Sequence, residues 1–326
     1  MTKDEVLTIL LKNNGYISGE LISSRLHISR AAVNGAVKSL KSDGCIIDSI
    51  TNKGYHLISC PDRLFAGEVC SYLSEDRWGR VICIPKTDST NNLLKEMIKN
   101  DIPSGTCIIA NEQTGGRGRM GRSFISPANT GIYMSILLRP SGDLSDMSEI
   151  TAWTAVAVHN AIKNAYGVNT DIKWVNDLYI NGRKITGILT EMMIEGESGV
   201  VSNVIIGIGI NVNQEETDFP DELKGIAASI ASATGIRNLS RARLAAEVIT
   251  EMDKLSDNWT SEKASYIDTY RKNCITLNRQ VDVINYATGE RRSGFAAGIN
   301  DDFSLKVRFD DGTVTDVKSG EVSVKW

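Results

Sequence analysis

The sequence contains few histidines and no paired cysteines, which argues against several kinds of catalytic, metal-binding and disulfide-bonded protein. The sequence has three His among its 326 residues, and His27 and His56 both lie in the first sixty. The third, His159, lies in an apolar segment that predicts a buried helix. We therefore expect no His-based catalytic triad and no resident metal centre in the rest of the chain. The six Cys are scattered without a C-x-x-C pair, so no disulfide framework is expected either.

Long apolar runs are also missing, and we expect no secretory leader. No stretch approaches the ~18 to 20 apolar residues that a membrane span needs. The chain starts Met-Thr-Lys-Asp-Glu, without the basic and then apolar profile of a signal peptide. With 41% hydrophobic and 23% charged residues the composition is that of a globular protein. We expect a soluble, cytoplasmic protein of two or three domains that does not bind membranes.

The first sixty residues predict a winged helix-turn-helix domain, residues 1–60. The apolar spacing and capping residues predict, in order, a helix ending near Asn13, helices Glu20–Leu26 and Arg30–Leu40, and strands Ile46–Ile50 and Tyr55–Ile58. Helices joined by a short turn and followed by a hairpin are typical of DNA-binding domains. The alternative is a domain that serves only as a protein contact.

On the DNA-binding interpretation, the third helix enters the major groove. The candidate DNA contacts are Ser29, Arg30, Asn34 and Lys38, together with Lys53 at the hairpin tip. Gly35 inside this helix costs about 1 kcal/mol relative to Ala. We interpret this unfavourable glycine as a position where a neighbouring backbone must approach the helix closely.

Residues 64–272 predict a second domain of the α+β class. Pro61 ends the hairpin, and a new apolar pattern starts at Leu64. Helices and strands then alternate irregularly, and Asn181-Gly182 is a two-residue hairpin signal. A hairpin-rich segment flanked by helices favours a largely antiparallel, mixed sheet over a doubly wound parallel one.

A loop rich in Arg and Gly, residues 113–122, carries the clearest chemical signal. Its Gly116-x-Gly118-x-x-Gly121 matches the dinucleotide fingerprint, but the chain that follows is not helical, so we reject that match. Arg117, Arg119 and Arg122 remain, on a backbone that glycine makes flexible. Such a loop can wrap a polyanion. The alternative is a solvated basic loop.

Three further segments are candidates for ligand binding. Lys173, flanked by Ile and Trp on a strand that we expect to be interior, needs an anionic partner; an edge-strand lysine is the alternative. The small polar residues 87–92 exceed what helix capping requires and suggest a site for a urea or amide group. Gly207 and Gly209 indicate a strand that another part of the chain approaches closely.

These segments together resemble biotin protein ligases. The resemblance rests on Ser89-Thr90-Asn91, the Arg-Gly loop with Gln113, Lys173-Trp174-x-Asn176-Asp177, and Gly207-Ile208-Gly209-Ile210-Asn211, in that order. With the N-terminal domain, the whole chain resembles the bifunctional biotin protein ligases and biotin-operon repressors of bacteria. Val175 and Gly115 stand where many members have Pro and Ala.

The resemblance implies a fold and a set of site residues. The expected fold is α+β and multidomain: a winged helix, a catalytic domain like class II aminoacyl-tRNA synthetases, and an SH3-like barrel over residues 273–326. Residues 281–317 agree, since they form short alternating segments. The implied biotin-binding residues are Ser89, Thr90, Asn91, Gln113, Arg117, Gly118, Arg119 and Lys173. Arg119, Arg122 and Asn211 would bind the nucleotide, and Lys173, Arg119 and Arg122 would be catalytic.

The resemblance also implies an activity and its partners. The expected reaction is the ATP- and Mg²⁺-dependent ligation of biotin to a lysine of the biotin carboxyl carrier protein. Biotinyl-5′-AMP would be both the intermediate and the co-repressor for a homodimer on operator DNA. The alternatives are a ligase that does not bind DNA, a transcription factor with an inactive ligase domain, and a ligase for lipoate. The choice of biotin over lipoate rests on the motifs alone.

Overall fold

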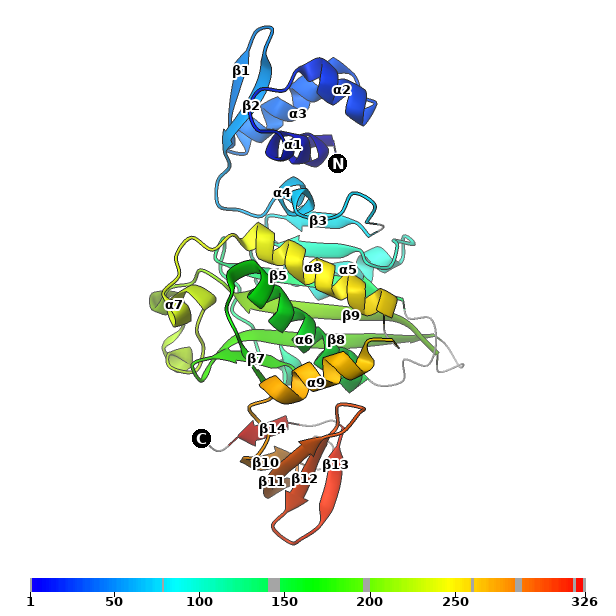
Figure 1. The fold of residues 1–326 in the computed structure, drawn as a ribbon, viewed down its shortest axis with the longest axis vertical. Helices are drawn as coiled ribbons and strands as arrows, with labels where there is room; N and C mark the ends of the chain where they lie inside the picture. The colour runs from blue at the N-terminus through cyan, green and yellow to red at the C-terminus, as the bar shows by residue number, and fades with distance from the viewer. Residues whose placement is uncertain are drawn as a thin grey trace.

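The computed structural model arranges the chain as three units along one long axis. It describes residues 2–77, 79–139, 147–195, 200–258, 261–284, 289–318 and 321–324. The N-terminal helices and hairpin lie at one end, the large sheet with its helices in the middle, and the C-terminal strands at the other end (Figure 1). No helix among these residues is both long and apolar enough to cross a membrane.

The N-terminal unit confirms the predicted winged helix. It consists of α1 (Thr2–Lys12), α2 (Gly19–Leu26), α3 (Arg30–Ser42), β1 (Ile46–Ile50) and β2 (Gly54–Ser59). Ser18 and Ser29 cap α2 and α3 as expected, each accepting a backbone N–H at 3.1 Å. Apolar residues of all three helices and of β1 form one buried cluster, which fixes the hairpin against the helices.

Two details of this unit differ from, or add to, the expectations. A Cβ atom at Gly35 would meet nothing within 4 Å, so the prediction of a close neighbouring backbone is wrong for the isolated chain. Cys45 and Cys60, one residue before β1 and one after β2, bring their Sγ atoms to 2.8 Å, and all six cysteines are free thiols.

The junction between the first two units is a short, tightly held segment. Phe65 packs into the N-terminal core, whereas its neighbour Leu64 packs into the central core. Helix α4 (Ala66–Ser71), which the sequence did not predict, then lies against α1. A Cβ at Gly67 would lie 2.3 Å from the Asp4 carbonyl oxygen, so only glycine permits this contact.

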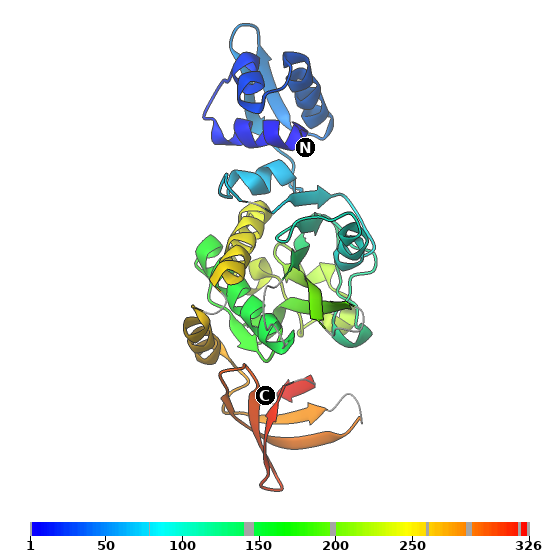
Figure 2. The ribbon, with the colours of Figure 1, turned by 90° about the vertical axis from the view of Figure 1, so that its right-hand side faces the viewer.

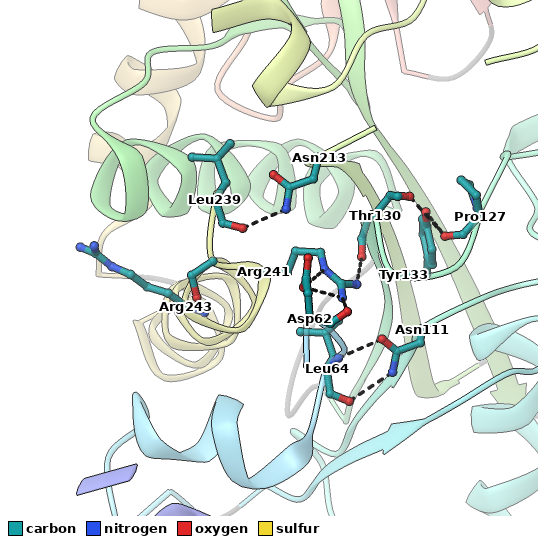
Figure 3. Close-up of polar contacts among 12 residues, drawn as sticks. Asp62, Leu64, Asn111, Pro127, Thr130, Tyr133, Asn213, Leu239, Arg241 and Arg243 are labelled. Atoms are coloured by element: carbon teal, nitrogen blue, oxygen red, sulfur yellow. Dashed lines mark hydrogen bonds and ion pairs between the residues drawn. The ribbon is translucent and has the colours of Figure 1, made fainter. Parts of the chain in front are cut away.

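Two side chains of the central unit bind this junction directly (Figure 3). Arg241, 2% exposed, donates from Nη2 to Asp62 Oδ1 at 3.0 Å and from Nη1 to the Gly131 carbonyl at 3.1 Å. The Asn111 side chain accepts the N–H of Leu64 at 2.9 Å and donates to its carbonyl at 3.2 Å. The linker is therefore held by the first residue of helix α8 (Arg241–Asn258) and by the residue that follows strand β4 (Cys107–Ala110).

The central unit is built on a seven-stranded mixed sheet in the order β3-β4-β5-β9-β8-β7-β6. Its strands are β3 (Val81–Ile84), β4 (Cys107–Ala110), β5 (Gly131–Leu138), β6 (Asp171–Lys173), β7 (Asp177–Ile180), β8 (Arg183–Glu195) and β9 (Val200–Asn211). The β3/β4 pair is parallel and the other pairs are antiparallel, as the hairpin signals predicted. Lys173 ends β6, an outer strand of the sheet, so the expected interior position is wrong.

Helices cover both faces of this sheet. They are α5 (Thr90–Ile98), α6 (Met147–Tyr166), α7 (Ile230–Thr234), α8 (Arg241–Asn258) and α9 (Lys263–Asn273). Side chains alternate along each strand, so Ile109 packs with α6 and α8, whereas Ile108 packs with Leu94 of α5. Figure 2 shows α5 on the opposite side of the sheet from α6 and α8.

The C-terminal unit is a five-stranded antiparallel sheet in the order β13-β12-β11-β10-β14. Its strands are β10 (Gln280–Ile284), β11 (Arg291–Ile299), β12 (Leu305–Phe309), β13 (Val314–Val317) and β14 (Glu321–Val324), the last of which was not predicted. Trp174 ties it to the central unit, because its indole Nε1–H donates to the Phe303 carbonyl at 2.9 Å.

Candidate functional site

One cavity of about 380 Å³ collects the segments that the sequence singled out. Its walls come from the start of α5, the Arg-Gly loop, the turn from β6 to β7, and β9. All ten ligand-binding residues expected from the sequence line it: Ser89, Thr90, Asn91, Gln113, Arg117, Gly118, Arg119, Arg122, Lys173 and Asn211. These positions are up to 122 residues apart in the chain, so the fold rather than local spacing brings them together.

The start of α5 presents buried polar groups to this cavity. Ser89, Thr90 and Asn91 are each at most 6% exposed. Ser89 occupies the N-cap position of α5 but makes no side-chain capping bond, so simple capping does not explain its presence. The Thr90 N–H instead donates to Gln113 Oε1 at 2.8 Å, which joins α5 to the loop.

The Arg-Gly loop is closed on itself by backbone hydrogen bonds. The Gly118 N–H donates to the Arg122 carbonyl at 2.7 Å, and the Phe124 N–H donates to the Gly116 carbonyl at 2.9 Å. A Cβ at Gly116 would lie 2.5 Å from the Phe124 carbonyl oxygen, so this closure requires glycine. The loop is therefore a narrow ribbon that aims its Arg side chains from a defined backbone.

The loop also reaches the lysine segment on the other side of the cavity. Arg119 Nη1 donates to Asn176 Oδ1 at 3.1 Å, and Asn176 Nδ2 donates to the Ile188 carbonyl at 3.1 Å. Lys173 lies three residues before Asn176, with its Nζ 5.9 Å from the centroid of the Tyr179 ring. The structure thus places Arg119 and Lys173 on the walls of one cavity.

Strand β9 forms the floor, and its glycines are needed there. A Cβ at Gly207 would lie 2.5 Å from Asn91 Oδ1, and one at Gly209 would lie 2.6 Å from the Phe124 ring. Both contacts confirm the predicted close approach. Asn211 closes the strand, but its amide is occupied: Nδ2 donates to the Ala228 carbonyl and Oδ1 accepts from Gln214, each at 3.1 Å.

Several wall residues were not predicted from the sequence. Lys184 lines the cavity and forms an ion pair of 2.8 Å with Asp177. Phe124 contacts both the cavity and Tyr133, whose ring centroid is 6.4 Å away. The Asn-Gly turn at residues 181–182 could have drawn attention to Lys184, since it places this residue on the strand after β7. Burial raises the pKa of Tyr133 to about 12, so Tyr133 stays neutral at physiological pH.

The five predicted DNA contacts are all exposed on the N-terminal unit. Ser29 caps α3 and Arg30 forms an ion pair of 3.2 Å with Glu20, so both already have protein partners. Lys38 projects from the middle of α3, and Lys53 lies 5.8 Å above the ring of Tyr16. Asn34 Nδ2 lies 3.5 Å from the Tyr55 hydroxyl, which places the wing, the hairpin of β1 and β2, beside α3.

Two known protein families match separate parts of the chain. Residues 83–211 match the biotin/lipoate A/B protein ligase family, and residues 2–56 match an HTH domain. The bifunctional ligase/repressor BirA of Bacillus subtilis is 42% identical over 236 residues, 72% of each chain. The Escherichia coli protein of the same name is 30% identical over 321 residues, 98% of this chain and 96% of the other.

A solved structure has a similar fold over three quarters of the chain. The biotin protein ligase of Aquifex aeolicus, determined in complex with biotin and ATP, aligns with a TM-score of 0.63 and 26% identity. The alignment covers 75% of this chain and 98% of that one. Family match, near full-length relatives and fold agree: the chain belongs to the bifunctional ligase/repressor family of biotin protein ligases.

Proposed function

We propose that this cavity activates biotin with Mg-ATP and transfers it to a lysine of a biotin carboxyl carrier protein. The observation that carries the proposal is the meeting of Arg119 and Lys173 with the polar start of α5 in one cavity. The polar end suits the urea head of biotin, and the cationic end suits its carboxylate together with the ATP phosphates. The urea head would be held by Ser89, Thr90, Asn91 and Gln113. Arg117 and Gly118 would line the side chain of biotin.

In the first step the biotin carboxylate attacks the α-phosphate of ATP. A C–O–P bond forms, the bond to the β-phosphate breaks, and biotinyl-5′-AMP and pyrophosphate result. Two anions must approach each other, so catalysis is mainly electrostatic. A cation ~4 Å away at an effective dielectric near 20 contributes about 4 kcal/mol. Lys173 and Arg119 would supply this charge, while Arg122 and the Mg²⁺ that accompanies ATP would neutralise pyrophosphate, and Asn211 would face the adenylate.

In the second step the uncharged amine of the carrier lysine attacks the carbonyl carbon of the mixed anhydride. An amide bond forms, AMP leaves with the electron pair of the broken C–O bond, and the amine loses a proton to solvent. No protein nucleophile is required. This agrees with the placement of His159, which is buried, hydrogen-bonded to Thr170 and not among the residues that line the cavity.

The substrate is tested by a transfer experiment. The full chain is incubated with ATP, a carrier domain, and either labelled biotin or labelled lipoate. We expect label from biotin to appear on the carrier and label from lipoate to be absent. Transfer of lipoate instead of biotin would contradict the proposed substrate.

We also propose that ligand binding favours a homodimer that places two winged helices on operator DNA, with biotinyl-5′-AMP as co-repressor. The exposed polar face of α3 and the wing support DNA binding. Sedimentation and operator binding are measured with and without biotin plus ATP. We expect both the mass and the affinity to rise with ligand; no change in either would leave only the ligase activity. A protein that needs ATP, carrier and operator together belongs in the cytoplasm.

A further inference from the structure

A charged pair lies directly behind the polar end of the cavity. Glu191 of β8 accepts from Asn91 Nδ2 at 2.7 Å and from Lys95 Nζ at 2.6 Å. Asn91 lines the cavity, whereas Glu191 and Lys95 do not. This pair therefore acts on a ligand only through the groups in front of it.

The carboxylate of Glu191 fixes the orientation of Asn91. A carboxylate only accepts hydrogen bonds, so the amide nitrogen of Asn91 must face Glu191 and its Oδ1 must face the other way. There Oδ1 meets Ser135 Oγ at 2.5 Å. Because an amide oxygen cannot donate, Ser135 must give its single proton to Asn91.

The direction of the Ser135 hydrogen bond also determines what the Thr90 hydroxyl can do. Its Oγ1 lies 2.7 Å from Ser135 Oγ and 3.1 Å from Gln113 Oε1. Both neighbours can only accept: the Ser135 proton is used on Asn91, and Gln113 Oε1 is held in place by the Thr90 backbone N–H. The Thr90 proton therefore stays within the protein, and toward the cavity its hydroxyl presents lone pairs only.

Packing prevents the network from reversing easily. A Cβ at Gly207 would lie 2.5 Å from Asn91 Oδ1, so β9 is pressed against this amide. Thr90, Asn91 and Ser135 are all at most 6% exposed, so bulk solvent has little access to the network.

We infer that Glu191 is a positioning residue that makes this end of the cavity selective for a ligand head with N–H donors. A cyclic urea supplies such a donor to Thr90. An alkyl chain or a ring of sulfur and carbon atoms does not, and it would leave the lone pairs of Thr90 buried without a partner. The inference rests on the proposed placement of the urea head beside Thr90.

The test compares biotin with its cyclic carbonate analogue, in which ring oxygens replace both urea N–H groups. In Glu191→Gln one amide oxygen must serve two donors, Lys95 and Asn91. If the oxygen of the introduced glutamine accepts from Lys95, the amide N–H of that glutamine faces Asn91. The Asn91 amide then flips, so that its nitrogen donates to Ser135. Ser135 in turn donates its proton to Thr90. We expect calorimetry to show that the preference for biotin over the carbonate, a ratio of two Kd values, falls about tenfold. An unchanged ratio would overturn the inference.

Two further variants guard against trivial explanations. Glu75→Gln makes the same chemical change in an exposed pair with Lys12 and should leave the ratio unchanged. The swap Glu191→Gln with Asn91→Asp retains the overall charge and again turns an acceptor oxygen toward Ser135, so it should restore the preference for biotin. A swap variant that behaves like the single variant would contradict the directional argument.

The placement of the urea head is tested separately by Thr90→Val. If the head lies beside Thr90, this variant loses the preference for biotin over the carbonate. If biotin binds Thr90→Val as tightly as it binds the parent protein, the proposed placement of the head is wrong, whatever Glu191 does.

Discussion

At the scale of single residues, two glycines that face each other across β8 and β9 differ in whether they can be replaced by alanine. Gly187 and Gly209 are paired in register. A Cβ at Gly209 would lie 2.6 Å from the Phe124 ring, whereas one at Gly187 would meet the flexible end of Lys184 at 3.4 Å. An added Cβ atom is therefore tolerated much less well at position 209 than at position 187.

We predict that Gly209→Ala displaces Phe124 and the loop that it closes. It should cost about 1–3 kcal/mol of stability and weaken biotin binding at least tenfold, because overpacking forces neighbouring groups out of position. Gly187→Ala is the matched control and should bind biotin nearly normally. Calorimetry and thermal unfolding of the two variants check this; equal biotin affinities would show that the Phe124 contact does not shape the site.

The site also shows which residues a sequence can and cannot reveal. Arg119 and Lys173 stand out because charges beside Gly or between apolar residues need an explanation. Glu191 and Ser135 do not stand out, since each is an ordinary polar residue in a strand. Their importance arises from contacts with Asn91, 100 and 44 residues away in the chain, which no local pattern encodes.

At the scale of elements, the interior of α3 offers a clear measurement. Gly35 is exposed, helical and has open space around its Cβ position. Gly15 also has open space, but its φ of +115° is a conformation that alanine adopts poorly.

We predict that Gly35→Ala stabilises the N-terminal unit by about 1 kcal/mol, because alanine loses less backbone entropy in a helix. Gly15→Ala should destabilise it despite the same change in volume. Urea unfolding of both variants tests the pair. A loss of stability in Gly35→Ala would mean that the helix contacts a neighbour at this position after all.

Helix α4 gives a prediction about pH. The pKa of Glu68 is raised to about 7, mainly by burial, which outweighs the lowering by Arg241, with a smaller raising contribution from Asp62. The folded protein thus binds this proton more tightly than the unfolded chain, whose Glu pKa is about 4.3. The stability associated with this proton is present below pH ~4 and is lost as the pH rises to 7.

We predict that Glu68→Gln removes this loss, so that the variant is more stable than the parent protein at pH 8 and its stability falls less between pH 4 and 7. Glu5→Gln on the exposed face of α1 is the control. Unfolding at a series of pH values decides: parallel pH profiles for Glu68→Gln and the parent would contradict the prediction.

Elements were predicted unevenly, for physical reasons. The helices and hairpin of the winged unit have caps and turn residues that act locally, and their bounds agree closely with the structure. Lys173 was placed on an interior strand because Ile and Trp flank it, but strand order depends on pairing between distant segments. The short elements α4, β3 and β14 are defined by tertiary contacts and gave no periodic signal long enough to detect.

At the scale of the whole molecule, the linker and the cavity share the same strands. Asn111 holds Leu64 of the linker and lies two residues before Gln113, which lines the cavity. Gly131 accepts from Arg241 and pairs with Asn211 at the cavity end of β9. The residues that line the cavity and those that hold the linker to the winged helix therefore belong to one frame, as the proposed effect of ligand on DNA binding requires.

The central claim is that cations on two walls of one cavity neutralise biotin and ATP as they react. The most direct measurement is pyrophosphate release by Lys173→Ala, with Lys224→Ala, which removes a surface pair with Asp221, as the control. We predict that Lys173→Ala folds normally but that its rate of pyrophosphate release falls at least a hundredfold, as expected when a cation contributing several kcal/mol is removed. A folded Lys173→Ala variant that releases pyrophosphate at the rate of the control would contradict it.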